Sequence, residues 1–262
     1  MLFFTDLDNT LIYSHRHCIP GDRVWVEMLN GRNQSFMTAR TAGFYRAQDW
    51  LLPVPLTTRN SQQYARLAPA LEALGWHDAL VSNGAVLLRD GVPDPEWWAE
   101  SLEISGRDRS EYNAALELVR GMVSPDSLVS RDPFMFYVKT GSAAELYSFL
   151  VRETDAAHLA VFRDSRKVYC LPRSLNKGAA ARRYQIRSGH EGYIAAGDSE
   201  FDIPMLRAAD ICLCPEGLPD FVPAGKRIVC SGVFSDTICD RLTELRETLS
   251  GGRSAFFQRN NT

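Results

Sequence analysis

The sequence predicts an α/β fold in which a helix-flanked parallel sheet is interrupted by an inserted α+β module. Toward both ends of the chain, apolar runs of strand length alternate with helical patterns, which is typical of parallel strands joined by crossover helices. Between about Gly84 and Pro172 this alternation stops, and a turn and a proline-rich piece lead into a different order of elements. We therefore expect a discontinuous core domain, 1–83 and 174–262, and an inserted domain, 84–173.

The N-terminal part of the core should begin with a strand that runs straight into acidic residues. After it, Asn-Gly between two apolar runs is a strong signal for a hairpin, which could act as a flap beside the first strand. The remaining patterns predict alternating helices and strands, the second helix ending at Gly75. The expected elements are a strand at Leu2–Asp6, a hairpin of Val24–Leu29 and Gln34–Thr38, helices at Ala39–Leu52 and Ser61–Leu74, and strands at Val54–Leu56 and Ala79–Val81.

The inserted module should combine two helices with a few strands, and Ser142 with Glu145 predicts a capping box at one helix start. Its expected elements are a strand at Val86–Leu88, helices at Ser110–Met122 and Ser142–Glu153, and strands at Phe134–Lys139, Leu159–Arg163 and Lys167–Leu171. The core pattern then resumes with helices at Asn176–Arg187, Phe201–Ala208 and Asp236–Leu249 and strands at Tyr193–Ala196 and Ile211–Leu213, before a polar, frayed tail from Gly251 to Thr262.

Composition excludes several classes of protein. The 262 residues are 45% hydrophobic and 23% charged, as in ordinary globular proteins, and the net charge of −3 offers no positive field for nucleic acid or an anionic membrane. We expect no membrane span and no leader, hence a cytoplasmic protein, either monomer or dimer. The six cysteines lack Cys-x-x-Cys spacing and are expected to be buried free thiols, and the loop cluster of His15, His17 and Cys18 is assigned no role.

Four polar motifs stand at expected strand ends or helix starts of the core. They are Asp6-Leu7-Asp8-Asn9-Thr10, Thr57-Thr58-Arg59, Asn176-Lys177-Gly178 and Gly197-Asp198-Ser199-Glu200-Phe201-Asp202. Each alone is weak, because Asp-x-Asp and Gly-Asp-Ser also occur in ordinary loops and turns. In an open parallel sheet, however, ligands bind outside the carboxyl ends of the strands. The motifs are therefore expected to converge on one pocket.

In order and context these motifs resemble the haloacid dehalogenase (HAD) superfamily of phosphohydrolases. The spacing of Asp6 and Asp8 after an N-terminal apolar strand matches, as does Gly-Asp followed four residues later by Asp202 and Ile-Pro-Met-Leu. Ser82-Asn83-Gly84-Ala85 and Leu175-Asn176-Lys177-Gly178 are typical of subclass IIB, which carries a C2-type α+β cap and includes Cof-type, sucrose-phosphate and mannosyl-phosphoglycerate phosphatases. The resemblance implies a Rossmann-like core with 84–173 as its cap.

The resemblance also implies an aspartyl-phosphate mechanism with Mg²⁺ as cofactor. Asp6 would be the nucleophile, and Asp6, the backbone carbonyl of Asp8 and the side chain of Asp198 would hold the ion, which prefers hard oxygen ligands. Asp8 would protonate the leaving alcohol and then activate water. Because the dehalogenase branch lacks this second aspartate, Asp8 favours hydrolysis of phosphate esters.

The other matched positions would support the phosphoryl group. Lys177 would supply a positive charge and Thr57 a hydroxyl to the phosphoryl oxygens, although Thr58, which replaces a common glycine, leaves a one-residue ambiguity. Asp202 would orient Lys177 or a metal-bound water from behind the site. Asn9 also replaces a glycine that is common after the second aspartate.

Substrate contacts are less well specified by the sequence. Arg59 and Asn83 directly follow expected core strands, so we expect both to face the crevice. Trp97 and Trp98 fit either sugar stacking or ordinary packing. A second anionic group of a substrate could be held by basic residues of the inserted module, namely Arg131, Lys139, Arg163, Arg166 and Lys167.

The sequence hypothesis is thus a phosphatase acting on a small phosphorylated metabolite, with a sugar phosphate favoured because a large cap would exclude phosphoproteins. A phosphomutase would share the aspartyl-phosphate but return the phosphoryl group to another hydroxyl. A non-enzymatic phospho-acceptor switch would also combine acidic residues, a Thr or Ser and a Lys, but receiver domains of that kind have no cap.

Overall fold

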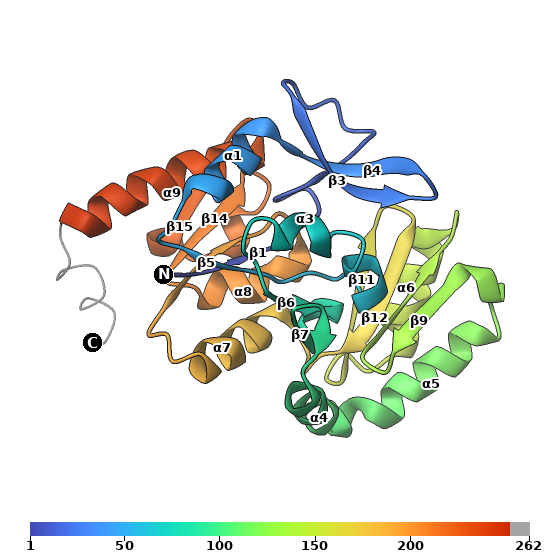
Figure 1. Cartoon of the computed structure of the whole chain (residues 1–262). Coiled ribbons are helices and arrows are strands. Elements are labelled where there is room, and N and C mark those ends of the chain that lie inside the picture. Colours follow the sequence, from blue (N-terminus) through green and yellow to red (C-terminus); the bar gives the residue numbers. More distant parts are fainter. Residues whose placement is uncertain (252–262) are drawn as a thin grey trace.

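A computed structural model describes residues 1–251 and shows a five-stranded parallel sheet at the centre of the core (Figure 1). The strand order is β15-β14-β13-β1-β5, so the chain adds β5 on one side of β1 and the later strands on the other. This confirms the predicted Rossmann-like α/β core. The strands are β1 (Leu2–Thr5), β5 (Leu52–Pro55), β13 (Tyr193–Ala196), β14 (Ile211–Pro215) and β15 (Arg227–Cys230).

Helices cover both faces of this sheet, which is why its strands are continuously apolar. The helices α1 (Ala39–Ala47) and α9 (Phe234–Gly251) cover one face, and α7 (Lys177–Arg187) and α8 (Ile203–Ala208) cover the other (Figure 1). Successive residues of β1 point to opposite faces, so Phe3 joins the first layer while Leu2 and Phe4 join the second.

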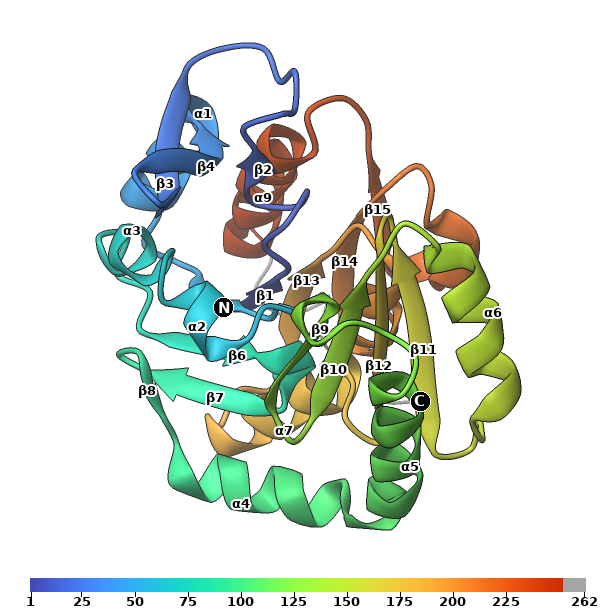
Figure 2. The ribbon, with the colours of Figure 1, turned by 90° about the vertical axis from the view of Figure 1, so that its right-hand side faces the viewer.

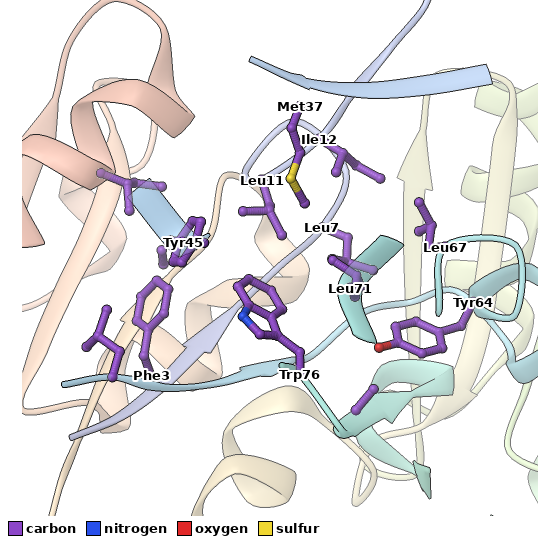
Figure 3. Close-up of a cluster of buried hydrophobic side chains, with 14 of the residues drawn as sticks. Phe3, Leu7, Leu11, Ile12, Met37, Tyr45, Tyr64, Leu67, Leu71 and Trp76 are labelled. Carbon is purple, nitrogen blue, oxygen red and sulfur yellow. The ribbon is translucent and has the colours of Figure 1, made fainter. Parts of the chain in front are cut away.

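Aromatic side chains organise the layer beneath α1. Figure 3 shows Phe3, Tyr45 and Trp76 in one buried cluster, and the rings of Tyr45 and Trp76 meet edge to face with centroids 5.0 Å apart. Leu7 and Leu11, from the loop that follows β1, lie in the same cluster. The loop that carries Asp6 and Asp8 is therefore anchored by its apolar residues.

The predicted hairpin is confirmed as β3 (Arg23–Leu29) and β4 (Arg32–Thr38), and β2 (Tyr13–Ser14) adds a third strand beside β4. Asn30 and Gly31 at its tip have φ of 51° and 71°, as the tight turn of a twisted hairpin requires. Figure 2 shows the hairpin at one end of the core, next to α3.

The expected third parallel strand does not join the central sheet. Instead, β6 (Asp78–Val81) pairs with the antiparallel β7 (Val86–Arg89), which pairs with β8 (Val92–Pro93). A single bridge between Leu56 and Leu80 is what links β6 to the end of β5 in the described chain. The hydrogen-bonding capacity of β6 goes mainly to its own hairpin.

Beyond this hairpin lies an antiparallel sheet of order β11-β12-β10-β9, with α5 and α6 packed on its outer face (Figure 2). The division of the chain into 1–83, 84–173 and 174–262 stays a prediction. The elements of this cap are α4 (Pro95–Ile104), α5 (Arg109–Arg120), β9 (Leu128–Asp132), β10 (Met135–Lys139), α6 (Ala143–Glu153), β11 (Leu159–Asp164) and β12 (Lys167–Pro172).

Several local expectations were wrong. The helix expected over 61–74 is two short helices, α2 (Ser61–Tyr64) and α3 (Ala68–Glu72), because Pro69 fits only the first turn of a new helix. The expected capping box is absent, since the Ser142 side chain makes no cap hydrogen bond. The helix expected over 201–208 begins as a 3₁₀ turn, Glu200–Asp202, with Pro204 in the first turn of α8.

Other differences are shorter or missed elements. The first long helix ends at Ala47 rather than Leu52, and α4, β9 and β15 were not anticipated. The cysteines are free and buried as expected, except the exposed Cys18. No helix within residues 1–251 has the length and apolarity to cross a bilayer. The tail from 252 onward and the side chain of Arg131 lie outside the described residues.

Gly178 sits where α7 approaches α8, and a Cβ built there would lie 2.4 Å from the backbone oxygen of Pro204. We therefore expect Gly178→Ala to lower the free energy of unfolding by about 1–3 kcal/mol, since backbone atoms must move to make room for the methyl group. Urea unfolding measures the effect.

The matched control is Gly43→Ala in α1, where a Cβ meets nothing within 4 Å. This substitution is expected to raise the free energy of unfolding by about 0.4–1 kcal/mol. Equal effects of the two substitutions would show that α7 and α8 are not in backbone contact at Gly178.

Candidate active site

Two carboxylates lie at the ends of neighbouring central strands, at the point where the strand order reverses. Asp6 directly follows β1, and its backbone N–H donates to the Ala196 oxygen at the end of β13 at 2.9 Å. Asp198 follows β13 after a single glycine. Because β5 continues from β1 in one direction and β13 in the other, this is the switch point at which α/β sheets form ligand crevices.

Lys177, the first residue of α7, places a buried ammonium group between two carboxylates. Its Nζ lies 2.7 Å from Oδ1 of Asp6 and 2.6 Å from Oδ1 of Asp202. Burial alone would lower the pKa of Lys177, but the charges of Asp202 and Asp6 outweigh it and raise that pKa above its ordinary value. The ammonium therefore stays charged and fixes the Asp6 side chain.

Asp202 organises the loop that carries Asp198. Its Oδ2 accepts hydrogen bonds from the backbone N–H groups of Asp198 and Ser199, at 3.1 and 2.9 Å, and from the Ser199 hydroxyl at 2.8 Å. A Cβ on Gly197 would lie only 2.4 Å from the Asp202 Cβ. Both oxygens of Asp202 are therefore engaged, one by Lys177 and the other by the loop.

The acidic cluster fits a divalent cation. Asp6, Asp198 and Asp202 each bring a carboxylate oxygen within 4.8 Å of the others. Burial, followed by the neighbouring carboxylates against the opposing charge of Lys177, raises the pKa of Asp6 well above its ordinary value. Burial and the charge of Asp202 likewise raise the pKa of Asp198 to about 7. A hard cation would relieve this repulsion, and the oxygen donors suit Mg²⁺.

The Thr10 hydroxyl donates to Oδ1 of Asp198 at 2.9 Å, which ties the loop after β1 to the loop after β13. The sequence places Thr10 within the first motif but indicates no function for it. Asn9, beside it, has φ of 61°, a backbone conformation that asparagine tolerates better than most residues. This explains how the glycine expected at that position can be replaced.

Asp8 forms a bidentate ion pair with Arg59. Arg59 Nε and Nη2 donate to its Oδ2 and Oδ1, each at 2.8 Å, while 48% of the Asp8 side chain remains exposed to the cavity. Burial by the surrounding protein opposes ionisation, but the hydrogen bonds and charge of Arg59, followed by the charges of Lys167 and Lys177, lower the pKa of Asp8. Arg59 thus lines the cavity, with its guanidinium bound to protein carboxylates.

Glu27 of β3 completes this arrangement, and it was not among the residues expected from the sequence. Its buried carboxylate accepts from Arg59 at 3.1 Å, from Arg66 at 2.7 Å and from the Ser35 hydroxyl at 2.6 Å. Register shifts on both sides of Glu27 interrupt the pairing of β3 with β4, so Val26 and Glu27 are both buried in succession. A bulge of this kind re-aims a side chain, and strict alternation along a strand gives no sign of it.

A cavity of about 530 Å³ lies between the acidic cluster and the cap sheet. Asp6, Asp8, Arg59, Lys177 and Asp198 line its core side, and Tyr137, Phe162, Lys167 and Tyr169 line its cap side. Phe201, next to Asp202, packs against Phe162 with ring centroids 4.2 Å apart and the rings tilted by 32°, and it meets Tyr169 edge on at 5.1 Å. The cap sheet therefore lies directly over the acidic loop.

The remaining predicted residues divide between the cavity and the protein interior. Thr58 lines the cavity, whereas Thr57 is buried with its hydroxyl accepting from the Arg59 N–H at 3.2 Å. Asn83 is buried, and its amide donates to the Leu175 oxygen at 3.3 Å. Neither Thr57 nor Asn83 is among the cavity-lining residues of the described chain.

The tryptophans belong to packing rather than to the cavity. Trp97 is fully buried and donates to the Gly84 oxygen at 3.1 Å, with the Arg183 guanidinium 3.4 Å from its ring centroid. Trp98 meets Phe134 at a centroid distance of 4.8 Å. Of the alternatives left by the sequence, ordinary packing is the one that these contacts favour.

No protein family profile and no curated protein matches the sequence. The structure is similar to the sucrose-phosphatase of Synechocystis sp. PCC6803 (TM-score 0.59, 17% identity, 94% of this chain and 98% of the other). It is also similar to a trehalose-6-phosphate phosphatase related protein (TM-score 0.56, 17% identity, 95% of this chain and 99% of the other). A third similar structure is a HAD subclass IIB sugar phosphatase (TM-score 0.62, 14% identity, 94% of this chain and 98% of the other). The chain therefore shares the fold of these solved phosphatases over 94–95% of its length.

Proposed function

We propose that this chain is a Mg²⁺-dependent phosphatase that hydrolyses a small phosphorylated metabolite, a sugar phosphate being the class we favour. The observation that carries the proposal is the Asp6 carboxylate fixed by the buried Lys177 ammonium, beside Asp198 and at the floor of the cavity. The similarity in fold to solved sugar phosphatases supports the same conclusion.

In the first step, Asp6 attacks phosphorus, so that a bond from its carboxylate oxygen to phosphorus forms as the ester oxygen leaves. Lys177 stabilises the negative charge on the phosphoryl oxygens, with a hydroxyl of Thr57 or Thr58 in support. Mg²⁺, held by Asp6, Asp198 and the Asp8 carbonyl, would offset the repulsion between carboxylate and phosphate. The departing oxygen takes its proton from Asp8.

In the second step, Asp8 removes a proton from water, which attacks the aspartyl-phosphate, releasing phosphate and restoring Asp6. Arg59 favours the ionised form of Asp8 that this step requires. A bound phosphoryl dianion beside Asp8 would favour its protonated form in the first step, because like charges raise a carboxyl pKa. Glu27 holds Arg59 in place throughout.

The cavity limits the size of the substrate. Its volume of about 530 Å³ lies within the range of roughly 300–1,000 Å³ that is typical of small-molecule sites. The contacts of Phe201 with Phe162 and Tyr169 hold the cap over the reaction centre. A roof this close leaves room for a metabolite but not for a folded phosphoprotein.

Asp6→Asn should reduce Mg²⁺-dependent release of phosphate from 4-nitrophenyl phosphate by roughly 10³-fold or more, because the variant lacks the nucleophile. Initial rates of 4-nitrophenolate formation measure the loss. The matched control is Asp22→Asn, an exposed aspartate outside the cavity lining, which should retain full turnover. Full turnover in Asp6→Asn would refute the mechanism.

The raised pKa of Asp198, from 3.8 to about 7, predicts how stability responds to pH and metal. A carboxyl whose folded-state pKa is raised stabilises the fold below the unfolded pKa and loses that contribution as pH rises through the folded pKa. In the metal-free protein, the contribution of Asp198 to the free energy of unfolding should therefore fall by at most about 4 kcal/mol between pH 4 and pH 7.5. We expect Mg²⁺ to raise Tm more at pH 8 than at pH 5.

Thermal unfolding with Mg²⁺ or a chelator checks this response. Asp198→Asn should abolish most of the pH-dependent difference. Asp240→Asn, at an exposed ion pair with Arg40, should preserve it. An equal Mg²⁺ effect on Asp198→Asn and on the unaltered protein would show that Asp198 does not hold the ion.

Product analysis separates the phosphatase from the two alternatives. With Mg²⁺ and hexose phosphates, we expect phosphate to accumulate in step with the free sugar, since Asp8 faces the cavity and can activate water. An isomeric hexose phosphate as the main product would identify a phosphomutase. A stable acyl-phosphate on Asp6 without turnover would instead favour a phospho-acceptor switch. Phosphate release and sugar composition, measured on the same samples, decide among the three.

A further inference from the structure

The cap side of the cavity contains a cation held by aromatic rings. Lys167 begins β12, and its Nζ lies 5.5 Å from the ring centroid of Tyr137 and 5.9 Å from that of Tyr169. Tyr137 and Tyr169 are directly opposite each other on β10 and β12, and both line the cavity with Lys167. The rings therefore confine the lysine stem and present its ammonium group to the cavity.

Lys167 differs from the other buried or half-buried cations of the site in having no carboxylate partner. Lys177 and Arg59 each bind two acidic residues. Within residues 1–251, by contrast, no carboxylate oxygen lies within 4 Å of Lys167 Nζ. Asp164 is opposite Lys167 in the β11–β12 register but is exposed, and a contact with an exposed carboxylate is worth little.

Lys167 lines the cavity from the cap, whereas Asp6 and Lys177 line it from the core. In the proposed mechanism the phosphoryl group lies against Asp6 and Lys177, so the leaving group would extend toward the cap side, where Lys167 is. Among the other charged residues that line the cavity, Arg163, Asp164 and Glu200 are exposed, whereas Lys167 is half-buried. Solvent screens the exposed charges more strongly.

Resting on the proposed function, we propose that Lys167 selects substrates whose leaving group carries a second anionic group, a carboxylate or another phosphate. Such a group would gain a charge-assisted hydrogen bond from an ammonium that the protein leaves without a carboxylate. Tyr137 and Tyr169 limit the positions that the lysine can take. A neutral polyol in the same place leaves the ammonium without its strongest kind of partner.

The test compares paired substrates that differ in the charge of the leaving group. We expect kcat/KM to be about 10–100-fold higher for 3-phosphoglycerate than for glycerol 3-phosphate, the range given by one hydrogen bond to a charged group. Glucose 1,6-bisphosphate against glucose 6-phosphate forms the second arm and distinguishes a phosphate from a carboxylate. The preference should appear mainly in KM, because Lys167 contacts the leaving group before and during reaction.

Three variants isolate the role of Lys167. Lys167→Met keeps an apolar side chain against the rings and should bring the ratio within each pair to about threefold or less, a loss of most of the tenfold or greater preference. Lys167→Arg should retain the preference. Lys139→Met removes the same charge from the opposite position on β10, where the lysine is exposed and outside the cavity lining. This control should keep the ratio of the unaltered protein. Thermal unfolding of each variant reports on folding separately.

Binding to the Asp6→Asn protein separates failure of this proposal from failure of the proposed function. Calorimetric titration with the same paired compounds in the presence of Mg²⁺ requires no turnover. Tighter binding of the anionic member, lost in the Asp6→Asn, Lys167→Met double variant, supports Lys167 even if another reaction is catalysed. An absent preference in the Asp6→Asn protein, or one that persists in the double variant, overturns the proposal.

Discussion

The buried ammonium of Lys177 is the interaction on which the arrangement of the site depends. Asp6 and Asp202 come from different loops and would repel each other in an interior of low dielectric constant, yet Nζ lies 2.7 and 2.6 Å from their carboxylates. Removing one partner from a buried ion pair typically costs about 3–5 kcal/mol. Gly178 follows Lys177 in α7, and because it has no Cβ the start of α7 can pack directly against the backbone of Pro204 in α8.

The parts of this arrangement that the sequence predicts share one property, a local pattern with a fixed place in a parallel sheet. Asp6 and Asp198 follow apolar strands, so the topology alone brings them to the same edge. Asn30-Gly31 likewise fixes the hairpin from two residues, because its φ values suit few other pairs. Lys177 could be placed at a helix start from its motif, although its two partners are visible only in the structure.

What the sequence does not predict depends on contacts between distant segments or on broken periodicity. Glu27 reaches Arg59 because a bulge interrupts strand alternation, and Thr10 reaches Asp198 across 188 positions of sequence. Asn83 follows a strand as expected, but its positive φ of 60° and its hydrogen bond to Leu175 place it away from the cavity lining. Sequence position at a strand end therefore gives the edge of the sheet, but not the direction of the side chain.

The two faces of the cap sheet explain why its sequence is less informative than that of the core. The outer face packs Phe136, Val138 and Val168 against α5 and α6 as an ordinary hydrophobic core. The inner face carries Tyr137, Phe162 and Tyr169, which must pack on Phe201 and line the cavity at once.

Phe201 directly precedes Asp202 in the acidic loop, so the contact between cap and core is one residue away from the carboxylate that fixes Lys177. Displacement of the cap would therefore disturb the loop that carries Asp198. The coverage of the cavity and the geometry of the acidic cluster are physically linked.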